Sequence, residues 1–127
     1  MKTILVDAVF TFVSEEGVIF KEMYDLLETY KNNKIILTNA SDDRFEAYGL
    51  NKVPYPVFTL RHNPEKTDPK YFETLLSTNN MTSGNVIYFE HNPEAVKSAE
   101  SVGIKSYHYD EEKKDLLALK DFLSTNL

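Results

Sequence analysis

The sequence contains no cysteine, and this absence removes several classes of chemistry. Disulfide bonds, thiolate zinc sites and cysteine nucleophiles are all excluded. Long apolar runs are missing too, because no stretch approaches the ~20 residues needed to span a bilayer. The apolar N-terminal segment is interrupted by Asp7, and no small-residue cleavage site follows it. These absences fit a cytoplasmic protein, and we expect that location.

Positive charge is also scarce. The chain has 14 Lys and Arg against 20 Asp and Glu, which gives a net charge of -6. Nucleic-acid binding relies on clustered Lys and Arg to neutralise phosphates, and anionic membrane surfaces attract the same kind of basic segment. We therefore expect no nucleic acid and no membrane as a partner.

What the sequence does contain is a series of short apolar runs with turns between them. The 127 residues, 42% of them hydrophobic, suit a single domain over residues 1–127. Three runs are continuous and rich in β-branched residues, as in strands buried on both faces. They are "TILVDAV" (3–9), "KIILTNA" (34–40) and "NVIYFE" (85–90), with weaker candidates at 56–60 and 103–109.

Helical patterns separate these runs. Apolar residues recur at helical spacing over 20–30, and Ser41 is expected to cap a short helix that ends at Gly49. Asp-Pro and Asn-Pro pairs open the segments 68–80 and 92–103, and a last helix follows Asp110. Alternating strands and helices predict a parallel sheet covered on both sides, with ligands at the carboxyl ends of its strands.

Polar residues stand where those strands end. They are Asp7 with Thr11, Thr38 with Asn39, and Glu90 with His91; Lys66 precedes the third helix. In order and spacing, "ILVDAVFT", "KIILTNAS", "EKTDPKYF" and "NVIYFEHNPEAVKSAESVGI" resemble the motifs of the haloacid dehalogenase-like (HAD) hydrolases. The resemblance implies a three-layer α/β/α Rossmann-like fold. Its sheet would hold five parallel strands in the order 5-4-1-2-3.

The resemblance also implies roles for single residues. Asp7 would be the nucleophile that forms an acyl phosphate, with Thr38 and Lys66 holding the transferring phosphoryl group. A Mg²⁺ ion would be bound by Asp7, by the backbone carbonyl of Val9 and by Glu90. Substrate contacts would come from Thr11 and Asn39.

The motifs depart from the family at several positions. Val9 stands where the family has a second aspartate, which serves as general acid and base. Phe10 replaces a small residue before Thr11, and Glu90 with His91 replaces an acidic pair. The pair therefore has two readings, a metal ligand with a neighbouring imidazole or an exposed turn before a helix.

Two connections bear on the presence of a cap domain. The segments from Thr11 to Thr38 and from Asn39 to Lys66 are both shorter than the ~50 residues of a small domain, so we expect a fold without a cap. Residues 12–20 are expected to form a small hairpin flap instead. A response-regulator receiver competes as a fold, but the chain lacks the paired acids after the first strand and the acceptor aspartate after the third.

Two functions remain open on these grounds. The first is a weakened or rewired Mg²⁺-dependent phosphohydrolase that uses Asp7 as nucleophile on a phosphorylated substrate. The second is a catalytically inactive HAD-fold pseudoenzyme that binds a ligand or a protein partner. The retained Asp7 and Lys66 favour the first function. The loss of an acid at Val9 and the replacement of the acidic pair by Glu90 and His91 favour the second.

Overall fold

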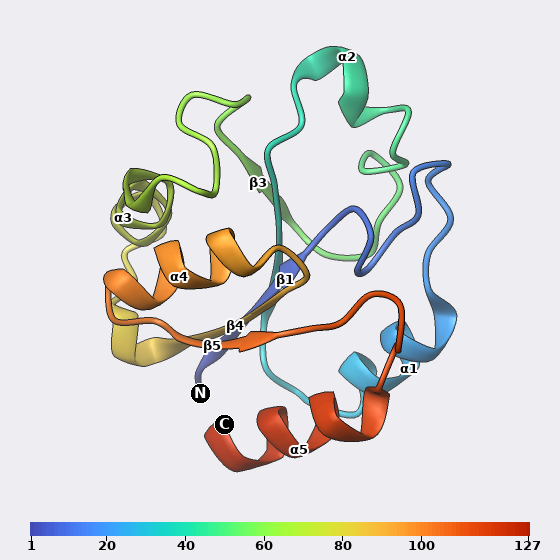
Figure 1. Cartoon of the computed structure of the whole chain (residues 1–127), viewed down its shortest axis with the longest axis vertical. Coiled ribbons are helices and arrows are strands. Elements are labelled where there is room, and N and C mark those ends of the chain that lie inside the picture. The colour runs from blue at the N-terminus through green and yellow to red at the C-terminus, as the bar shows by residue number, and fades with distance from the viewer.

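Three continuous apolar runs form the centre of a parallel sheet in the computed structural model, which covers residues 1–127 (Figure 1). The central strands are β1 (Thr3–Asp7), β2 (Lys34–Thr38) and β4 (Val86–Glu90), and the edges are β3 (Val57–Thr59) and β5 (Lys105–His108). The order is β3-β2-β1-β4-β5. The predicted order 5-4-1-2-3 is this order seen from the other edge, so the prediction is confirmed.

Helices cover both faces of the sheet, which confirms the predicted three layers (Figure 1). One face packs against α1 and α5, and the other packs against α3 and α4. No helix is both long and apolar enough to cross a membrane. The helices are α1 (Lys21–Glu28), α2 (Asp42–Phe45), α3 (Pro69–Thr78), α4 (Pro93–Ser101) and α5 (Leu116–Asn126), with a 3₁₀ turn, η1 (Ser83–Asn85).

The alternation of side chains along β1 divides the core into two layers. Ile4 and Val6 point into the layer with α1 and α5, whereas Leu5 points into the layer with α3 and α4. All three side chains are fully buried. A strand of this kind must be apolar at successive positions, which explains why the run reads as continuous rather than alternating.

The two Pro-containing helix starts form as the sequence predicts. The side chains of Asp68 and Asn92 each accept a hydrogen bond of 3.0 Å from the backbone N–H two residues later. A proline occupies the first helical position in both cases, where its missing N–H costs nothing. Gly103 ends the second of these helices with a φ of +88°, a conformation that favours glycine.

The predicted ends of two other helices are wrong. α2 stops at Phe45 rather than at Gly49, and the Ser41 hydroxyl donates to the Asp43 carboxylate instead of accepting from a backbone N–H. α5 begins only at Leu116, because the Asp110 carboxylate accepts from the two backbone N–H groups at 112 and 113 and holds a separate turn.

The flap predicted over 12–20 forms a narrow turn in which Val13 pairs with Ile19 in antiparallel fashion. Gly17 lies at its tip with a φ of +82°. A Cβ atom built on Gly17 would lie 2.9 Å from the backbone nitrogen of Gly49, so the flap and the loop after α2 touch through backbone.

Candidate active site

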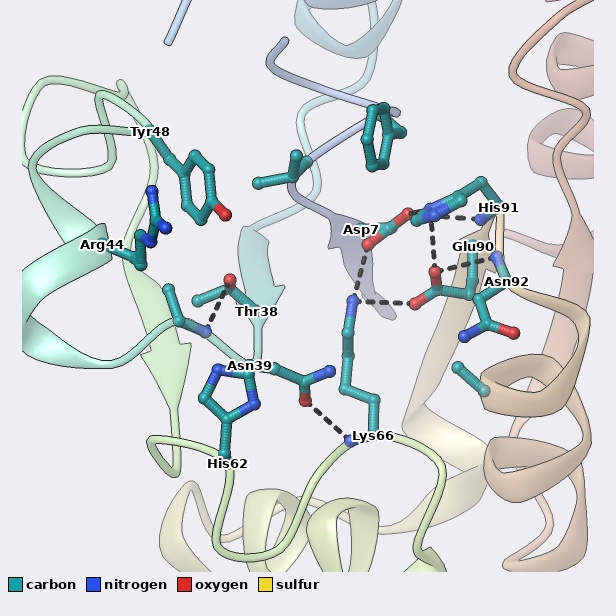
Figure 2. A pocket seen from close by; sticks show the side chains of 14 residues that line it. Asp7, Thr38, Asn39, Arg44, Tyr48, His62, Lys66, Glu90, His91 and Asn92 are labelled. Carbon is teal, nitrogen blue, oxygen red and sulfur yellow. Dashed lines mark hydrogen bonds and ion pairs between the residues drawn. The ribbon is translucent and has the colours of Figure 1, made fainter. Parts of the chain in front are cut away.

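The carboxyl ends of β1, β2 and β4 lie side by side, and they bring Asp7, Thr38 and Glu90 together. A cavity of about 250 Å³ opens above them (Figure 2). The sequence predicted this edge of the sheet because parallel strands all end on the same side. The residues that line the cavity are Asp7, Val9, Phe10, Thr38, Asn39, Ala40, Arg44, Tyr48, His62, Lys66, Glu90, His91, Asn92 and Ala95.

Lys66 joins the two carboxylates at the floor of this cavity. Its Nζ lies 2.6 Å from Oδ1 of Asp7 and 2.8 Å from Oε1 of Glu90, and its side chain is almost fully buried. The loop that carries it is held by Asn39, whose Oδ1 accepts a hydrogen bond of 2.7 Å from the Lys66 backbone N–H. The predicted lysine therefore reaches the predicted nucleophile (Figure 2).

The second oxygen of Asp7 has its own set of donors. Oδ2 accepts a hydrogen bond of 2.6 Å from the Thr11 hydroxyl and one of 3.2 Å from the backbone N–H of His91. The Nδ1 atom of His91 lies 2.5 Å from the same oxygen. Both oxygens of this buried carboxylate are thus engaged, and its orientation is fixed from three directions.

Glu90 is more deeply placed than an exposed turn would allow, so that reading is wrong. Its side chain is fully buried, and Oε1 accepts from the Tyr88 hydroxyl as well as from Lys66. Oε2 accepts a hydrogen bond of 3.0 Å from the backbone N–H of Asn92 and lies 3.1 Å from Nδ1 of His91. A buried carboxylate needs such partners, because an unpaired one would be strongly unfavourable.

Asp7, Lys66, Glu90 and His91 form a charged cluster, and attraction between its opposite charges offsets the effect of burial on the pKa values of its aspartate, lysine and histidine. Burial alone raises the pKa of Asp7, but the Lys66 ammonium and the His91 ring outweigh it and hold that pKa well below its usual range. Burial lowers the pKa of Lys66, yet the carboxylates of Asp7 and Glu90 raise it above its usual value. For His91, the hydrogen bonds to the same carboxylates overcome burial and raise the pKa to about 10. At neutral pH Asp7 is therefore an anion between two cations.

The opposite side of the cavity is built by the segments that follow β2 and β3. Thr38 is buried there, and its Oγ1 accepts a hydrogen bond of 3.1 Å from the backbone N–H of Ala40. Arg44, Tyr48 and His62 lie farther out on this side (Figure 2). Sequence reasoning missed Arg44 and Tyr48 as lining residues, because short turns around a four-residue helix carry no motif or period that places a side chain.

Three donors in the site could hold a metal ion. One ligand atom each from Asp7, Glu90 and His91 lies within 4.8 Å of the others. Val9 lines the cavity beside them, so its predicted carbonyl contact with a metal stays a prediction. The predicted substrate contacts of Thr11 and Asn39 also stay predictions. The Thr11 hydroxyl donates to Asp7 from outside the cavity lining, whereas Asn39 lines the cavity and accepts from the Lys66 backbone N–H.

No protein-family model matches the chain, and a comparison with curated proteins finds no match either. Solved structures do match its fold. The D,D-heptose 1,7-bisphosphate phosphatase of B. bronchiseptica, crystallised with magnesium and phosphate, matches over 100% of both chains with a TM-score of 0.76 and 12% identity.

Two further solved structures match the same fold. A HAD family enzyme of Bacteroides thetaiotaomicron, in complex with magnesium and inorganic phosphate, matches 85% of this chain and 93% of its own, with a TM-score of 0.69 and 12% identity. A HAD-superfamily hydrolase of subfamily IA from Geobacter sulfurreducens matches 92% and 96%, with a TM-score of 0.63 and 11% identity. The chain therefore has the fold of the haloacid dehalogenase-like hydrolases, as its motifs predict.

Proposed function

We propose that this protein is a phosphohydrolase that cleaves phosphate monoesters or acyl phosphates through a covalent intermediate on Asp7. The observation that carries the proposal is the Asp7 carboxylate itself, which lies at the floor of an open cavity and is ionised beside the Lys66 ammonium. The solved structures with magnesium and phosphate support the same class of reaction on this fold.

The reaction needs two displacements at phosphorus. First, a carboxylate oxygen of Asp7 bonds to phosphorus while the bond from phosphorus to the leaving oxygen breaks, and that oxygen takes a proton from solvent. Water then attacks phosphorus, the bond to the Asp7 oxygen breaks, and inorganic phosphate leaves. Lys66 and the Thr38 hydroxyl stabilise the negative charge on the other phosphoryl oxygens in both steps.

A divalent cation is the cofactor that the fold suggests, because two of the matching structures hold magnesium. One ligand atom each of Asp7, Glu90 and His91 lies within 4.8 Å of the others, close enough to bind one divalent cation. When bound, it would neutralise charge on the phosphoryl group and orient it toward Asp7. We propose Asp7 and Glu90 as its carboxylate ligands, with the Val9 carbonyl as a further donor.

The side chain at Val9 sets a limit on the substrates. A general acid typically contributes ~10²–10⁴-fold to such a reaction, and Val9 cannot donate a proton. Leaving groups that depart without protonation, such as aryl oxides and carboxylates, should therefore be favoured over alkoxides.

The valine at position 9 also favours a second function, binding without catalysis. Without a proton-handling group at Val9, the cavity could bind a phosphorylated ligand or a protein partner and not turn it over. This alternative makes the protein a HAD-fold binding module. It differs from the first function in one measurable respect, because binding would not require Asp7 to act as a nucleophile.

The experiment is a hydrolysis assay with p-nitrophenyl phosphate and acetyl phosphate, run without metal and with Mg²⁺ or Co²⁺. Wild type is compared with Asp7→Asn, and Asp25→Asn serves as a matched control because Asp25 is an exposed residue of α1. We expect turnover in wild type and Asp25→Asn and a loss of at least ~10²-fold in Asp7→Asn. Equal rates in wild type and folded Asp7→Asn would reject the phosphohydrolase and leave the binding module.

A further inference from the structure

The carboxylates of Asp7 and Glu90 can share a cation at two places, one on each side of the pair. Lys66 fills the first, in contact with Oδ1 of Asp7 and Oε1 of Glu90. Nδ1 of His91 faces the second, in contact with Oδ2 of Asp7 and Oε2 of Glu90 (Figure 2). A metal ion that uses both carboxylates must therefore enter on the His91 side, because the ammonium holds the other pair of oxygens.

The spacing on the His91 side resembles a set of metal ligands. Donors bound at ~2.0–2.2 Å to one ion lie roughly 3 Å apart. The His91 Nδ1 to Glu90 Oε2 distance of 3.1 Å already has this value. The Asp7 oxygen, 2.5 Å from Nδ1, needs only to move back slightly as the ion takes the place of the Nδ1 proton.

The chemistry of these donors does not suit Mg²⁺ well. Mg²⁺ is a hard cation that is held by oxygen ligands and keeps several waters in an octahedron. An imidazole nitrogen suits zinc, iron, nickel and related first-row ions instead. His91 stands where the resembling motif carries an acid, so this chain has replaced an oxygen donor by nitrogen.

We infer that this centre prefers a borderline transition-metal ion, such as Co²⁺ or Zn²⁺, through Nδ1 of His91 together with Asp7 and Glu90. The inference rests on the proposed function in placing the ion at the reacting carboxylate, and it names the class of ion that this chain selects. His91 is then the residue that sets the metal preference.

The test measures metal binding rather than activity. Co²⁺ and Mg²⁺ are titrated into wild type and His91→Asp by calorimetry, and the visible absorption of bound Co²⁺ shows whether its coordination changes when the imidazole is removed. Because transition ions exceed Mg²⁺ in affinity at many sites, the decisive quantity is the ratio of the two affinities in each variant. His62→Ala is the matched control, because His62 lines the same cavity outside the cluster and is exposed beside Glu65.

We expect one equivalent of Co²⁺ in wild type and His62→Ala, and a Co²⁺ to Mg²⁺ ratio that falls at least about tenfold in His91→Asp. An unchanged ratio, or an equal loss of Co²⁺ binding in His62→Ala, would overturn the inference. Circular dichroism checks that His91→Asp folds. If the three neighbouring carboxylates of that variant prevent folding, His91→Asn replaces it and should lose Co²⁺ binding without gaining Mg²⁺ binding.

The metal preference and the proposed function can fail separately. Co²⁺ selectivity without Asp7-dependent hydrolysis would keep this inference and reject the function. Mg²⁺ selectivity with such hydrolysis would do the reverse.

Discussion

The two walls of the cavity are built on different principles. The inner wall consists of Asp7, Lys66, Glu90 and His91, which are buried or half-buried and bonded to one another, and Thr11, outside the cavity lining, donates to Asp7. The outer wall consists of Arg44, Tyr48 and His62. It comes from turns and loops, and its two basic residues are exposed.

The difference is that the charged groups of the inner wall are held in place by one another, whereas Arg44 of the outer wall is free to contact a ligand. On the inner wall each charge has a partner at hydrogen-bond distance, so its position is held by the other charged side chains. On the outer wall Arg44 forms no ion pair, whereas the other arginine, Arg61, bonds to Asp42 at 2.8 Å. A free guanidinium at a cavity mouth is available to an incoming anion.

The largest effect of this difference between the walls is expected when the Lys66 ammonium is removed from the inner wall. Lys66→Met leaves the buried carboxylates of Asp7 and Glu90 facing each other without the ammonium. We expect a loss of about 3–5 kcal/mol in the free energy of unfolding, measured with urea. Lys70→Met is the control, because Lys70 is exposed on α3, and it should change little. Equal effects in both variants would show that the cluster is not held together by Lys66.

The second test is the pH dependence of stability in metal-free buffer. Because the folded pKa of His91 is raised to about 10 from 6.5, its stabilisation is complete below about 6.5 and is lost as the pH rises toward 10. Asp7 has a lowered pKa, so its contribution is present above its usual value of 3.8 and is lost in stronger acid.

The measurement is urea unfolding at several pH values between 6.5 and 10. Wild type should lose stability across this window, whereas His91→Asn, which keeps a side-chain N–H without a titrating ring, should lose less. Parallel curves for the two proteins would show that His91 does not carry charge in the folded cluster.

A smaller effect is expected from one hydrogen bond that Thr11 donates to the inner wall. Thr11→Val removes the hydroxyl that donates to Oδ2 of Asp7 at 2.6 Å and puts a methyl group against a buried carboxylate. The cost should be about 1–3 kcal/mol in thermal or urea unfolding. Thr11→Ser keeps the hydroxyl and should recover most of the loss; failure to do so would point to packing rather than to the hydrogen bond.

The smallest effect is expected on the outer wall. Arg44→Ala should change the free energy of unfolding by less than about 0.5 kcal/mol, because the side chain is exposed and pairs with no carboxylate. Arg61→Ala, which breaks the exposed pair with Asp42, is a suitable comparison and should cost no more than about 1 kcal/mol. A large loss in Arg44→Ala would remove the distinction between the walls.

Much of the site could be predicted because the parallel sheet fixes where strands end. Asp7, Thr38 and Glu90 follow apolar runs, and such runs must place their carboxyl ends on one edge. The sequence could not predict that His91 reaches Oδ2 of Asp7, since the two residues lie 84 positions apart and only strand register brings them together.

The burial of Glu90 and the outer wall lay beyond sequence reasoning for a different reason. The buried Glu90 carboxylate accepts from the hydroxyl of Tyr88, which lies two residues earlier on the same strand and on the same side of the sheet. Nothing in the pattern distinguishes that tyrosine from an ordinary core residue. Arg44 and Tyr48 lie on and just after the four-residue α2, and this short segment has no sequence period that would place their side chains.

The central claim, that Asp7 is the nucleophile, is tested most directly by a search for its phosphorylated form. Val9 cannot activate water, so hydrolysis of the acyl phosphate should be slow and the intermediate should accumulate. Wild type mixed with acetyl phosphate and quenched in acid is digested and examined by mass spectrometry. The account predicts a phosphoryl group on the peptide that contains Asp7, and none in Asp7→Asn. Steady hydrolysis with an unmodified Asp7 peptide, and equal hydrolysis by Asp7→Asn, would contradict it.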